Sequence, residues 1–206
     1  MNSAKCAILL SIFAILTHSV LSAQYIGTPV DQPDTMLIWE GTVDYPVNSA
    51  VLDTAYMENR MALARIDTLA DSIKNHIDSI LIVGTASPEG RSGFNFELAG
   101  ERVRVLRDYI IDKYSLPDTN VIRTSVRVFS WDEIIPQLKS DTCLPDSAAV
   151  LKVLENPDRT DFSKGWTLRT RKSDAYHYIN STYLDYMRKG TISVLYHQKL
   201  PPPSPN

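Results

Sequence analysis

The sequence predicts an α+β fold, because strand-like and helix-like stretches alternate along most of the chain. The clearest strand is the apolar run from Ile80 to Val83, which Gly84 ends and which has the composition of a strand buried on both faces of a parallel or mixed sheet. A turn-rich loop follows from Thr85 to Phe94. From Asn95 onward, apolar residues recur at three- and four-residue steps, as on one face of a helix. This strand, loop and helix form the centre of the predicted fold.

Two elements are predicted ahead of this centre. Met36 to Tyr45 contains aromatic and β-branched residues and is interpreted as the first strand, which Pro46 ends or displaces to an edge. From Leu52 to Ile77, apolar residues keep helical spacing, which predicts a helix that covers one face of the sheet. Asn59 lies on this apolar stripe, where a buried amide that bonds nearby backbone is commoner than a ligand group.

The part of the chain after the central helix begins with another strand. Asn120 to Phe129 alternates between apolar and polar residues, which predicts a strand with one solvent-exposed face. Residues 130–190 then form a predicted helical insertion, and Thr191 to His197 is the expected last strand. The insertion is expected to hold helices at Trp131 to Leu138, Ser147 to Glu155 and Ser173 to Met187, with a loop around 157–165. An aromatic stripe in the last of these helices is more typical of a core than of a binding site.

The amino-terminal residues predict export. Lys5, an apolar run from Ala7 to Leu16 and small residues up to Ala23 are typical of a cleaved secretory signal peptide. No transmembrane span is expected, since no later stretch approaches about 18 consecutive apolar residues. We expect a signal peptide over 1–23, a flexible leader over 24–35, a single domain over 36–198 and a disordered proline-rich tail over 199–206.

Composition and motifs argue against several classes of function. The formal net charge of −3 argues against nucleic acid as a partner. A local basic group, interpreted as a solvated face more readily than as an anion-binding patch, consists of Lys164, Arg169, Arg171 and Lys172. The histidines show no metal-ligand spacing, and the Gly-x-Ser-x-Gly pattern of a nucleophile elbow is absent around Ser87. We therefore expect no metal, no cofactor and no enzymatic activity.

One charged residue lies on the apolar face of the central helix. Arg102 follows Leu98 by four residues and precedes Leu106 by four, so it lies on the stripe that faces the sheet. A guanidinium there needs an anionic partner or a route to water. Because ligands of open α/β sheets bind beyond the carboxyl ends of the strands, we interpret Arg102 as a ligand-facing cation. A structural ion pair with Glu89 or Glu101 is the alternative.

The same residues carry a resemblance to a known family. Gly84, the "ASPEG" loop, Asn95, Leu98 and Arg102 resemble the C-terminal peptidoglycan-binding domain of the outer-membrane protein A (OmpA) family. The sequence of this loop and the long region downstream of it resemble the versions of this domain found in Bacteroidetes. The resemblance implies an α/β sandwich with a βαβαβ core, a mixed sheet with helices on one face, and an insertion before the last strand.

The resemblance also implies a ligand and a location. In the family, an Asp of the loop and an Arg of the helix hold the diaminopimelate of the cell-wall stem peptide. Aligned on Asn95, the Arg falls on Arg102, whereas the Asp falls on Ser87, whose hydroxyl offers a neutral hydrogen bond of roughly half the strength. Glu89 is the candidate for the missing carboxylate. The implied function is that of a periplasmic module, associated with the outer membrane, that binds peptidoglycan through Arg102, Ser87, Glu89, Asn95 and Gly84.

A second hypothesis follows from the replaced aspartate. A chain that keeps the fold but has lost the wall ligand would serve as a non-enzymatic scaffold or assembly partner of an outer-membrane or fimbrial protein. In that case the insertion over 130–190 is expected to make the contact with the partner.

Overall fold

The computed structural model describes residues 34–199 except 74, 75, 117 and 118. The predicted signal peptide, the leader up to residue 33 and the tail from residue 200 lie outside the described residues. The described chain forms two compact units. The helical unit consists of Ala86–Phe96 and Val128–Met187, and it contains most of the predicted insertion. The sheet unit consists of the described residues within 34–85, 97–127 and 188–199.

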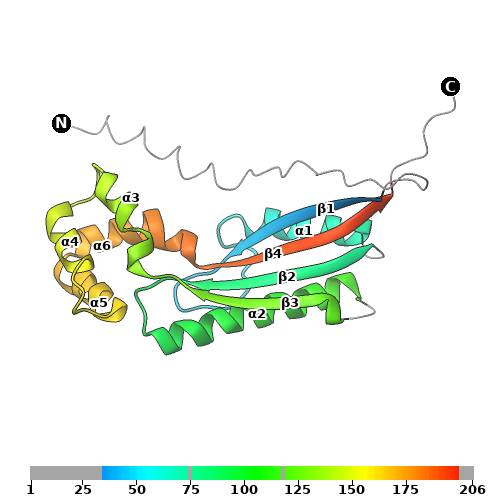
Figure 1. The fold of residues 1–206 in the computed structure, drawn as a ribbon, viewed down its shortest axis with the longest axis horizontal. Helices are drawn as coiled ribbons and strands as arrows, with labels where there is room; N and C mark the ends of the chain where they lie inside the picture. The colour runs from blue at the N-terminus through cyan, green and yellow to red at the C-terminus, as the bar shows by residue number, and fades with distance from the viewer. Residues whose placement is uncertain (1–33, 74–75, 117–118, 200–206) are drawn as a thin grey trace, which may run out of the picture. The chain divides into compact units, whose positions relative to one another are not determined.

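Four strands form the sheet: β1 (Asp34–Asp44), β2 (Ile77–Ala86), β3 (Ile122–Val128) and β4 (Lys189–Lys199). Their order is β1-β4-β2-β3, so the last strand of the chain lies between the first and the second. Strand β4 is antiparallel to both β1 and β2, whereas β3 runs in the same direction as β2 (Figure 1). The sheet is therefore mixed, which confirms the predicted fold class.

The register places apolar residues of three strands in one row. Val194 on β4 is opposite Trp39 on β1 and Ile80 on β2, and all three point to the same face. Because side chains alternate between the two faces of a sheet, the next row, with Ile38 and Leu195, points to the other face.

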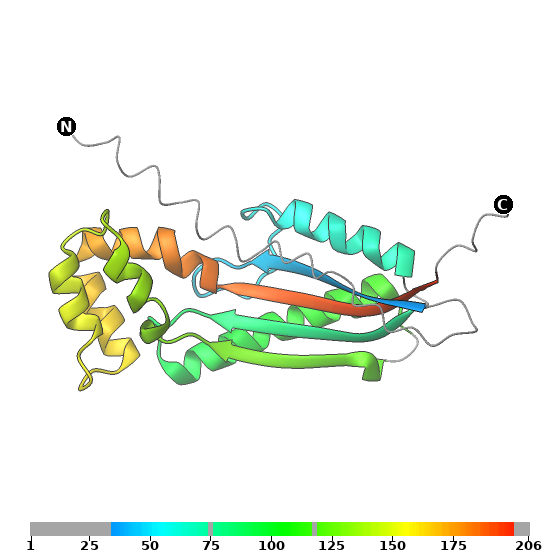
Figure 2. The same cartoon turned by 45° about the horizontal axis from the view of Figure 1, so that its top comes forward.

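Both helices of the sheet unit, α1 (Asn59–Ile73) and α2 (Ser92–Tyr114), cover one face of the sheet (Figure 2). They share a single core with the strands. The buried members of this core are Val43, Tyr45, Leu63, Ile66, Ala70, Ile73, Ile80, Ile82, Val103, Leu106, Ile110, Tyr114, Ile192 and Val194. The predicted arrangement of helices on one face is thus confirmed.

Helix α1 begins later than the sequence predicts. The chain before Asn59 forms turns, and Met57 has a positive φ of 45°. The Asp53 carboxylate accepts a hydrogen bond from the Ala55 N–H at 2.8 Å, and the Asn59 side chain donates to the Asp53 carbonyl at 2.8 Å. These local bonds compete with the helix, so the apolar spacing that starts at Leu52 does not continue one helix. The expected start at Leu52 is therefore wrong.

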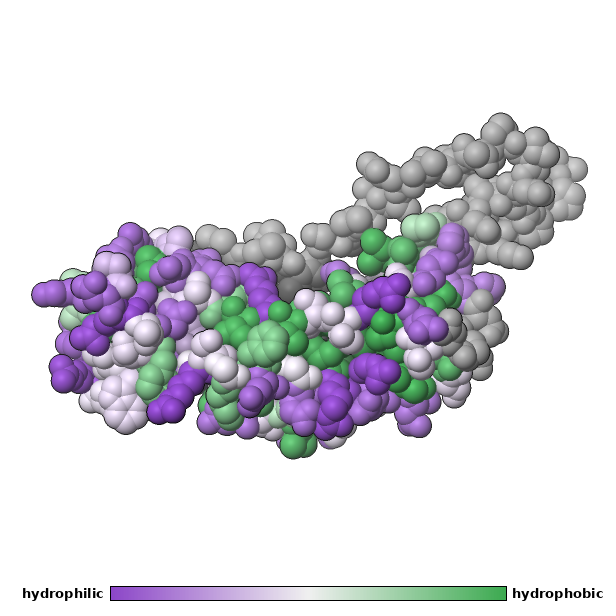
Figure 3. Space-filling view, turned by 60° about the horizontal axis from the view of Figure 1, so that its bottom comes forward, coloured by the Kyte–Doolittle hydropathy of each residue, from purple (hydrophilic) through white to green (hydrophobic). Residues whose placement is uncertain are grey.

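The second face of the sheet is open among the described residues, which corrects the expectation of a β2 strand buried on both faces. Leu81 on β2 is 41% exposed, and Met36 and Ile38 on β1 are 52% and 55% exposed. Both helices lie on the opposite face, so the apolar run predicts a strand correctly but not its two-sided burial. Figure 3 shows hydrophobic patches among hydrophilic residues on the face that it displays.

The helical unit is built from short segments around its own core. The segments are a 3-10 turn (Trp131–Glu133), α3 (Ile135–Ser140), α4 (Ser147–Leu154), α5 (Asp161–Arg171), α6 (Ser173–Ile179), a π-helical turn (Asn180–Leu184) and a second 3-10 turn (Asp185–Met187). The loop expected around 157–165 is wrong, because α5 starts at Asp161. The Thr160 hydroxyl caps this helix by accepting a hydrogen bond from the Ser163 N–H.

The aromatic stripe of the last predicted helix belongs to this core, as expected. Ile179 is fully buried and Tyr183 is 8% exposed. The hydroxyls of Tyr178 and Tyr183 both donate to one oxygen of Asp141, at 2.8 and 2.7 Å. The two aromatic side chains are thus fixed by packing and by a shared carboxylate.

Candidate functional site

Arg102 lies in the interior of the sheet unit. Its side chain projects from α2 and is 0% exposed. The guanidinium donates to three backbone carbonyls: Nε to Ser49 at 3.0 Å, Nη1 to Thr85 at 2.6 Å and Nη2 to Pro46 at 3.2 Å. Thr85 lies near the end of β2, and Pro46 and Ser49 follow β1. The charged group therefore lies at the carboxyl ends of two strands and ties both strand ends to α2.

Tyr45 forms the aromatic side of this site. The Arg102 Cζ lies 5.1 Å from the centre of the Tyr45 ring, and the Tyr45 hydroxyl donates to the Arg102 carbonyl at 3.3 Å. A guanidinium over an aromatic face is stabilised by the negative face of the ring. Burial raises the pKa of Tyr45 to about 12, although the neighbouring Arg102 acts to lower it. The sequence analysis missed this role of Tyr45.

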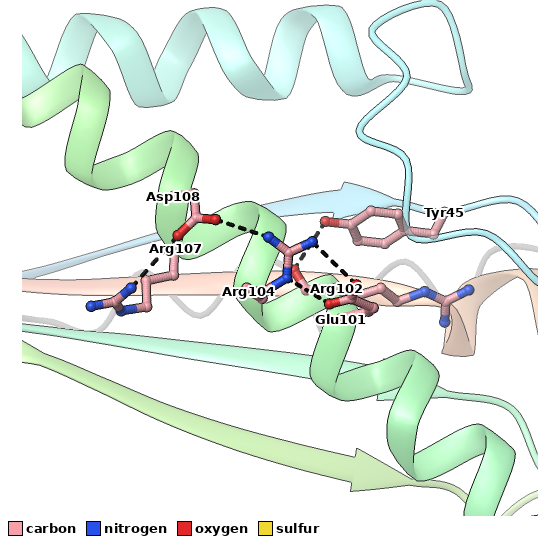
Figure 4. Close-up of polar contacts among 6 residues, drawn as sticks. All are labelled: Tyr45, Glu101, Arg102, Arg104, Arg107 and Asp108. Atoms are coloured by element: carbon pink, nitrogen blue, oxygen red, sulfur yellow. Dashed lines mark hydrogen bonds and ion pairs between the residues drawn. The ribbon is translucent and has the colours of Figure 1, made fainter.

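The alternative ion pair between Arg102 and Glu101 is not formed. Glu101 pairs with Arg104 at 2.7 Å, and Arg104 also contacts Asp108 at 3.2 Å. Figure 4 shows that the Arg102 guanidinium points away from these three residues, which lie along an exposed side of α2. The hydrogen bond from Arg104 lowers the pKa of Glu101.

The burial of Arg102 limits what the site can bind in this conformation. A ligand carboxylate reaches Nε and Nη2 only if the segment from Pro46 to Ser49 moves aside, because its carbonyls occupy these donors. The assignment of Arg102 as a ligand residue stays a prediction.

In the helical unit, Asn95 holds the loop that contains Ser87. The Asn95 side chain donates to the Ser87 carbonyl at 2.7 Å, and both residues are buried, at 5% and 6% exposure. A Cβ on Gly90 would lie 2.3 Å from the Asn95 Oδ1, so any larger residue here would displace the Asn95 amide. The observed role of Asn95 is to fix the loop against the first turn of α2.

Helix α5 packs against the same loop within the helical unit. A Cβ on Gly165 would lie 2.9 Å from the Glu89 Cα, which means that the helix backbone touches the loop backbone. The Arg91 guanidinium lies 5.3 Å from the centre of the Phe162 ring and adds a second contact. Part of the loop surface, including the half-buried Glu89, is thus covered by α5. The sequence analysis missed this role of Gly165, because it placed the residue in an expected loop and not in a helix.

Gly84 has a packing role in the sheet unit. A Cβ at this position would lie 2.1 Å from the Ala99 carbonyl oxygen and 2.7 Å from the Val103 Cγ2. The missing side chain therefore allows α2 to approach β2 closely.

The basic residues of α5 and its surroundings form local contacts. Lys164 is 6% exposed and lies 3.7 Å from Asp132 and 4.0 Å from Asp161. Burial raises the pKa of Asp161. Lys172 pairs with Asp146, and Arg169 lies over the ring of Trp166 on the same helix. These separate contacts favour structural and surface roles over one anion-binding patch.

The described part of the chain contains neither a candidate metal site nor a candidate membrane span. No cluster of three or more His, Cys, Asp or Glu side chains that could hold a metal ion occurs within it. None of the helices within residues 34–199, as far as they are described, has the length and apolar character needed to cross a membrane.

Titration of Tyr45 gives a test of its burial. Because the folded-state pKa of about 12 exceeds the ordinary 10.0, the protonated phenol stabilises the fold fully below about pH 10. This contribution is lost as the pH rises toward 12. We expect the unfolding free energy of the wild type, relative to Tyr45→Phe, to fall by about 2 kcal/mol between pH 9 and pH 12. Urea unfolding of both proteins across this range measures the difference, and a constant difference would contradict the burial.

Comparisons with known proteins find weakly similar solved structures only. No protein-family model and no curated protein matches the sequence. Among solved structures, the OmpA-like domain of FopA1 from Francisella tularensis subsp. tularensis SCHU S4 is 13% identical, with coverage of 84% of this chain and 80% of that one and a TM-score of 0.40. The cell wall anchor of the T6SS from Pseudomonas aeruginosa is 12% identical, with coverage of 81% and 85% and a TM-score of 0.36. At this level of similarity, neither structure carries an argument about function.

Proposed function

We propose that this protein is a non-catalytic assembly module of the cell envelope, exported to the periplasm, in which the helical unit binds a protein partner. The sheet unit provides the framework, since the hydrogen bonds of the Arg102 guanidinium join α2 to the ends of β1 and β2. Peptidoglycan binding through Arg102 is the second candidate.

The observation that carries the first proposal is the distribution of exposed aromatic residues. Among the described residues, the large aromatic side chains that remain exposed are Phe94 at 47%, Phe96 at 60%, Trp166 at 53% and Tyr186 at 49%. All four belong to the helical unit. The exposed large apolar residues of the sheet unit are aliphatic. Aromatic residues are enriched in protein interfaces and dominate their binding energy, so the helical unit has the composition of a recognition surface.

The buried core of the helical unit is built without these four rings. Its core is made by other residues, among them the fully buried Trp131, Leu138 and Leu168. Trp166 is oriented on the surface by Arg169, whose Cζ lies 5.4 Å from the centre of the ring. A side chain that is already ordered loses less entropy when it binds, which suits a role as an anchor.

Site-specific crosslinking in cells tests the first proposal. A photo-reactive amino acid at position 166 should form an adduct of defined mass with an envelope protein, whereas one at position 61 should not. Met61 is a matched control, because it is 55% exposed on α1 of the sheet unit. Trp166→Ala should leave the unfolding free energy within about 0.5 kcal/mol. The proposal fails if position 166 yields no adduct or the same adducts as position 61.

A different observation favours the second candidate. The Arg102 guanidinium lies at the carboxyl ends of β1 and β2, where the resemblance places the ligand arginine. A stem-peptide carboxylate could replace the carbonyls of Pro46 and Ser49, because charge-assisted hydrogen bonds are about twice as strong as neutral ones. This exchange requires the segment that follows β1 to move.

Sedimentation with purified insoluble cell wall tests this second candidate. The wild type and Arg104→Ala should be retained equally, whereas Arg102→Lys should lose most of its retention. A lysine keeps the charge but cannot form a two-bond fork to a carboxylate. If the wild type itself stays in the supernatant, or if Arg102→Lys is retained like the wild type, peptidoglycan binding through Arg102 is rejected.

A further inference from the structure

A groove lies between α1 and the edge strand β1 of the sheet unit. It has a volume of about 390 Å3 and is lined by Trp39 of β1 and by Ala64, Arg65, Thr68 and Leu69 of α1. Helix α1 runs beside β1 along this edge (Figure 2). The groove therefore combines an aromatic wall, small and aliphatic side chains, and one cation.

The shape of the groove depends on a glycine in β1. A Cβ on Gly41 would lie 2.2 Å from the Trp39 Cη2, so the indole ring extends along the strand over Gly41. This arrangement places the indole beside α1 and makes it part of the groove. Any larger residue at position 41 would displace the ring.

The backbone of β1 is available along the same edge. At its end, Asp44 turns its N–H and C=O away from β4 and bonds both to the side chain of Asn59, at 2.7 and 2.9 Å. Alternate residues of a strand direct these groups to the same side, so Ile38, Glu40 and Thr42 also direct theirs away from β4. Among the described residues, no strand pairs with this side of β1. The Asn59 amide already occupies the first position that an added strand would take.

We propose that the β1 edge binds an extended segment of a partner protein as an added strand, with one apolar side chain in the Trp39 groove and one acidic side chain at Arg65. Backbone hydrogen bonds to Ile38, Glu40 and Thr42 supply affinity, and the groove supplies specificity, as in other cases of strand addition. An acidic side chain would complement exposed Arg65, which forms no ion pair with a described residue. This site is independent of the surface proposed on the helical unit.

Amide hydrogen exchange on the full chain tests the inference. The probe is a soluble peptide of about eight residues. Threonine occupies every second position, and valine and glutamate alternate at the positions between. At saturation it should slow the exchange of the Ile38, Glu40 and Thr42 amides about tenfold or more. The Trp39 amide, which points toward β4, should change little. A control peptide with lysine in place of glutamate should bind more weakly at low salt.

Three variants separate strand addition from a change of fold. Ile38→Pro removes one outward N–H, a loss that an edge strand tolerates. In this variant the peptide should no longer slow exchange of the Glu40 amide. In Ile38→Thr, which keeps the N–H, the peptide should still slow it. Arg65→Glu lies on the surface and should reverse the preference between the two peptides. The inference is overturned if the peptide slows no outward amide or if Arg65→Glu leaves the preference unchanged. It is also overturned if these amides are already protected without peptide, since the chain itself or a second copy then covers the edge.

Discussion

We expect the free energy of unfolding of the Arg102→Ala variant to be lower than that of the wild type by about 3 to 5 kcal/mol. The substitution removes the donor from the buried carbonyl of Thr85 and from the partly buried carbonyls of Pro46 and Ser49. Each buried acceptor that loses its hydrogen bond costs about 1 to 3 kcal/mol, although water can recover part of this. The lost stacking on Tyr45 and the space left by a large side chain add to the cost.

Urea unfolding monitored by circular dichroism measures this loss, and Arg104→Ala is the matched control. Arg104 lies two residues along the same helix, and its side chain is 59% exposed and paired only with surface carboxylates. Exposed ion pairs contribute about 0 to 1 kcal/mol, so this variant should remain close to the wild type. Equal losses in the two variants would show that the Arg102 guanidinium is not held in the interior.

This stability effect decides how cell-wall binding by Arg102 variants is interpreted. An alanine at position 102 weakens the fold, so reduced retention by cell wall would not identify a ligand contact by itself. Arg102→Lys keeps a cation and part of the side-chain volume, although one ammonium cannot span the three carbonyl acceptors. Retention should therefore be compared at a temperature at which each variant is shown to be folded.

The sequence predicts most of the sheet unit because the periodicity of its side chains follows the geometry of strands and helices. The apolar run at Ile80 marks β2, and the helical spacing around Leu106 marks α2. Side-chain periodicity does not predict whether both faces of β2 are buried. An apolar residue such as Leu81 has the same appearance in a sequence whether or not a helix covers it, and here both helices lie on the opposite face.

The candidate site was predictable only in part. Helical spacing places Arg102 on the inner face of α2, because 3.6 residues per turn fix the direction of the side chain. Its acceptors could not be predicted, since they are backbone carbonyls from distant segments and every residue has a carbonyl. The contact between α5 and the Glu89 loop was equally hidden. It depends on Gly165, whose close approach becomes visible only when the helix and the loop are placed together.

Gly84→Ala should destabilise the protein by about 3 kcal/mol or more, although it adds a single methyl group. The added Cβ would lie 2.1 Å from the Ala99 carbonyl oxygen, and backbone atoms cannot move aside as the end of a flexible side chain can. Helix α2 must therefore shift away from β2. Such a shift also disturbs Arg102, which lies on the same helix and bonds to Thr85, the residue after Gly84.

Gly100→Ala is the matched control, and its effect should have the opposite sign. Gly100 lies on α2 one residue after Ala99, and a Cβ there would meet no atom within 4 Å beyond its chain neighbours and the backbone of its own helix. Alanine favours the helix over glycine by roughly 0.5 to 1 kcal/mol, so this variant should be more stable than the wild type. Urea midpoints that move in opposite directions for the two variants would support close packing of α2 on β2. Similar shifts for both would show that the two elements are not in contact at Gly84.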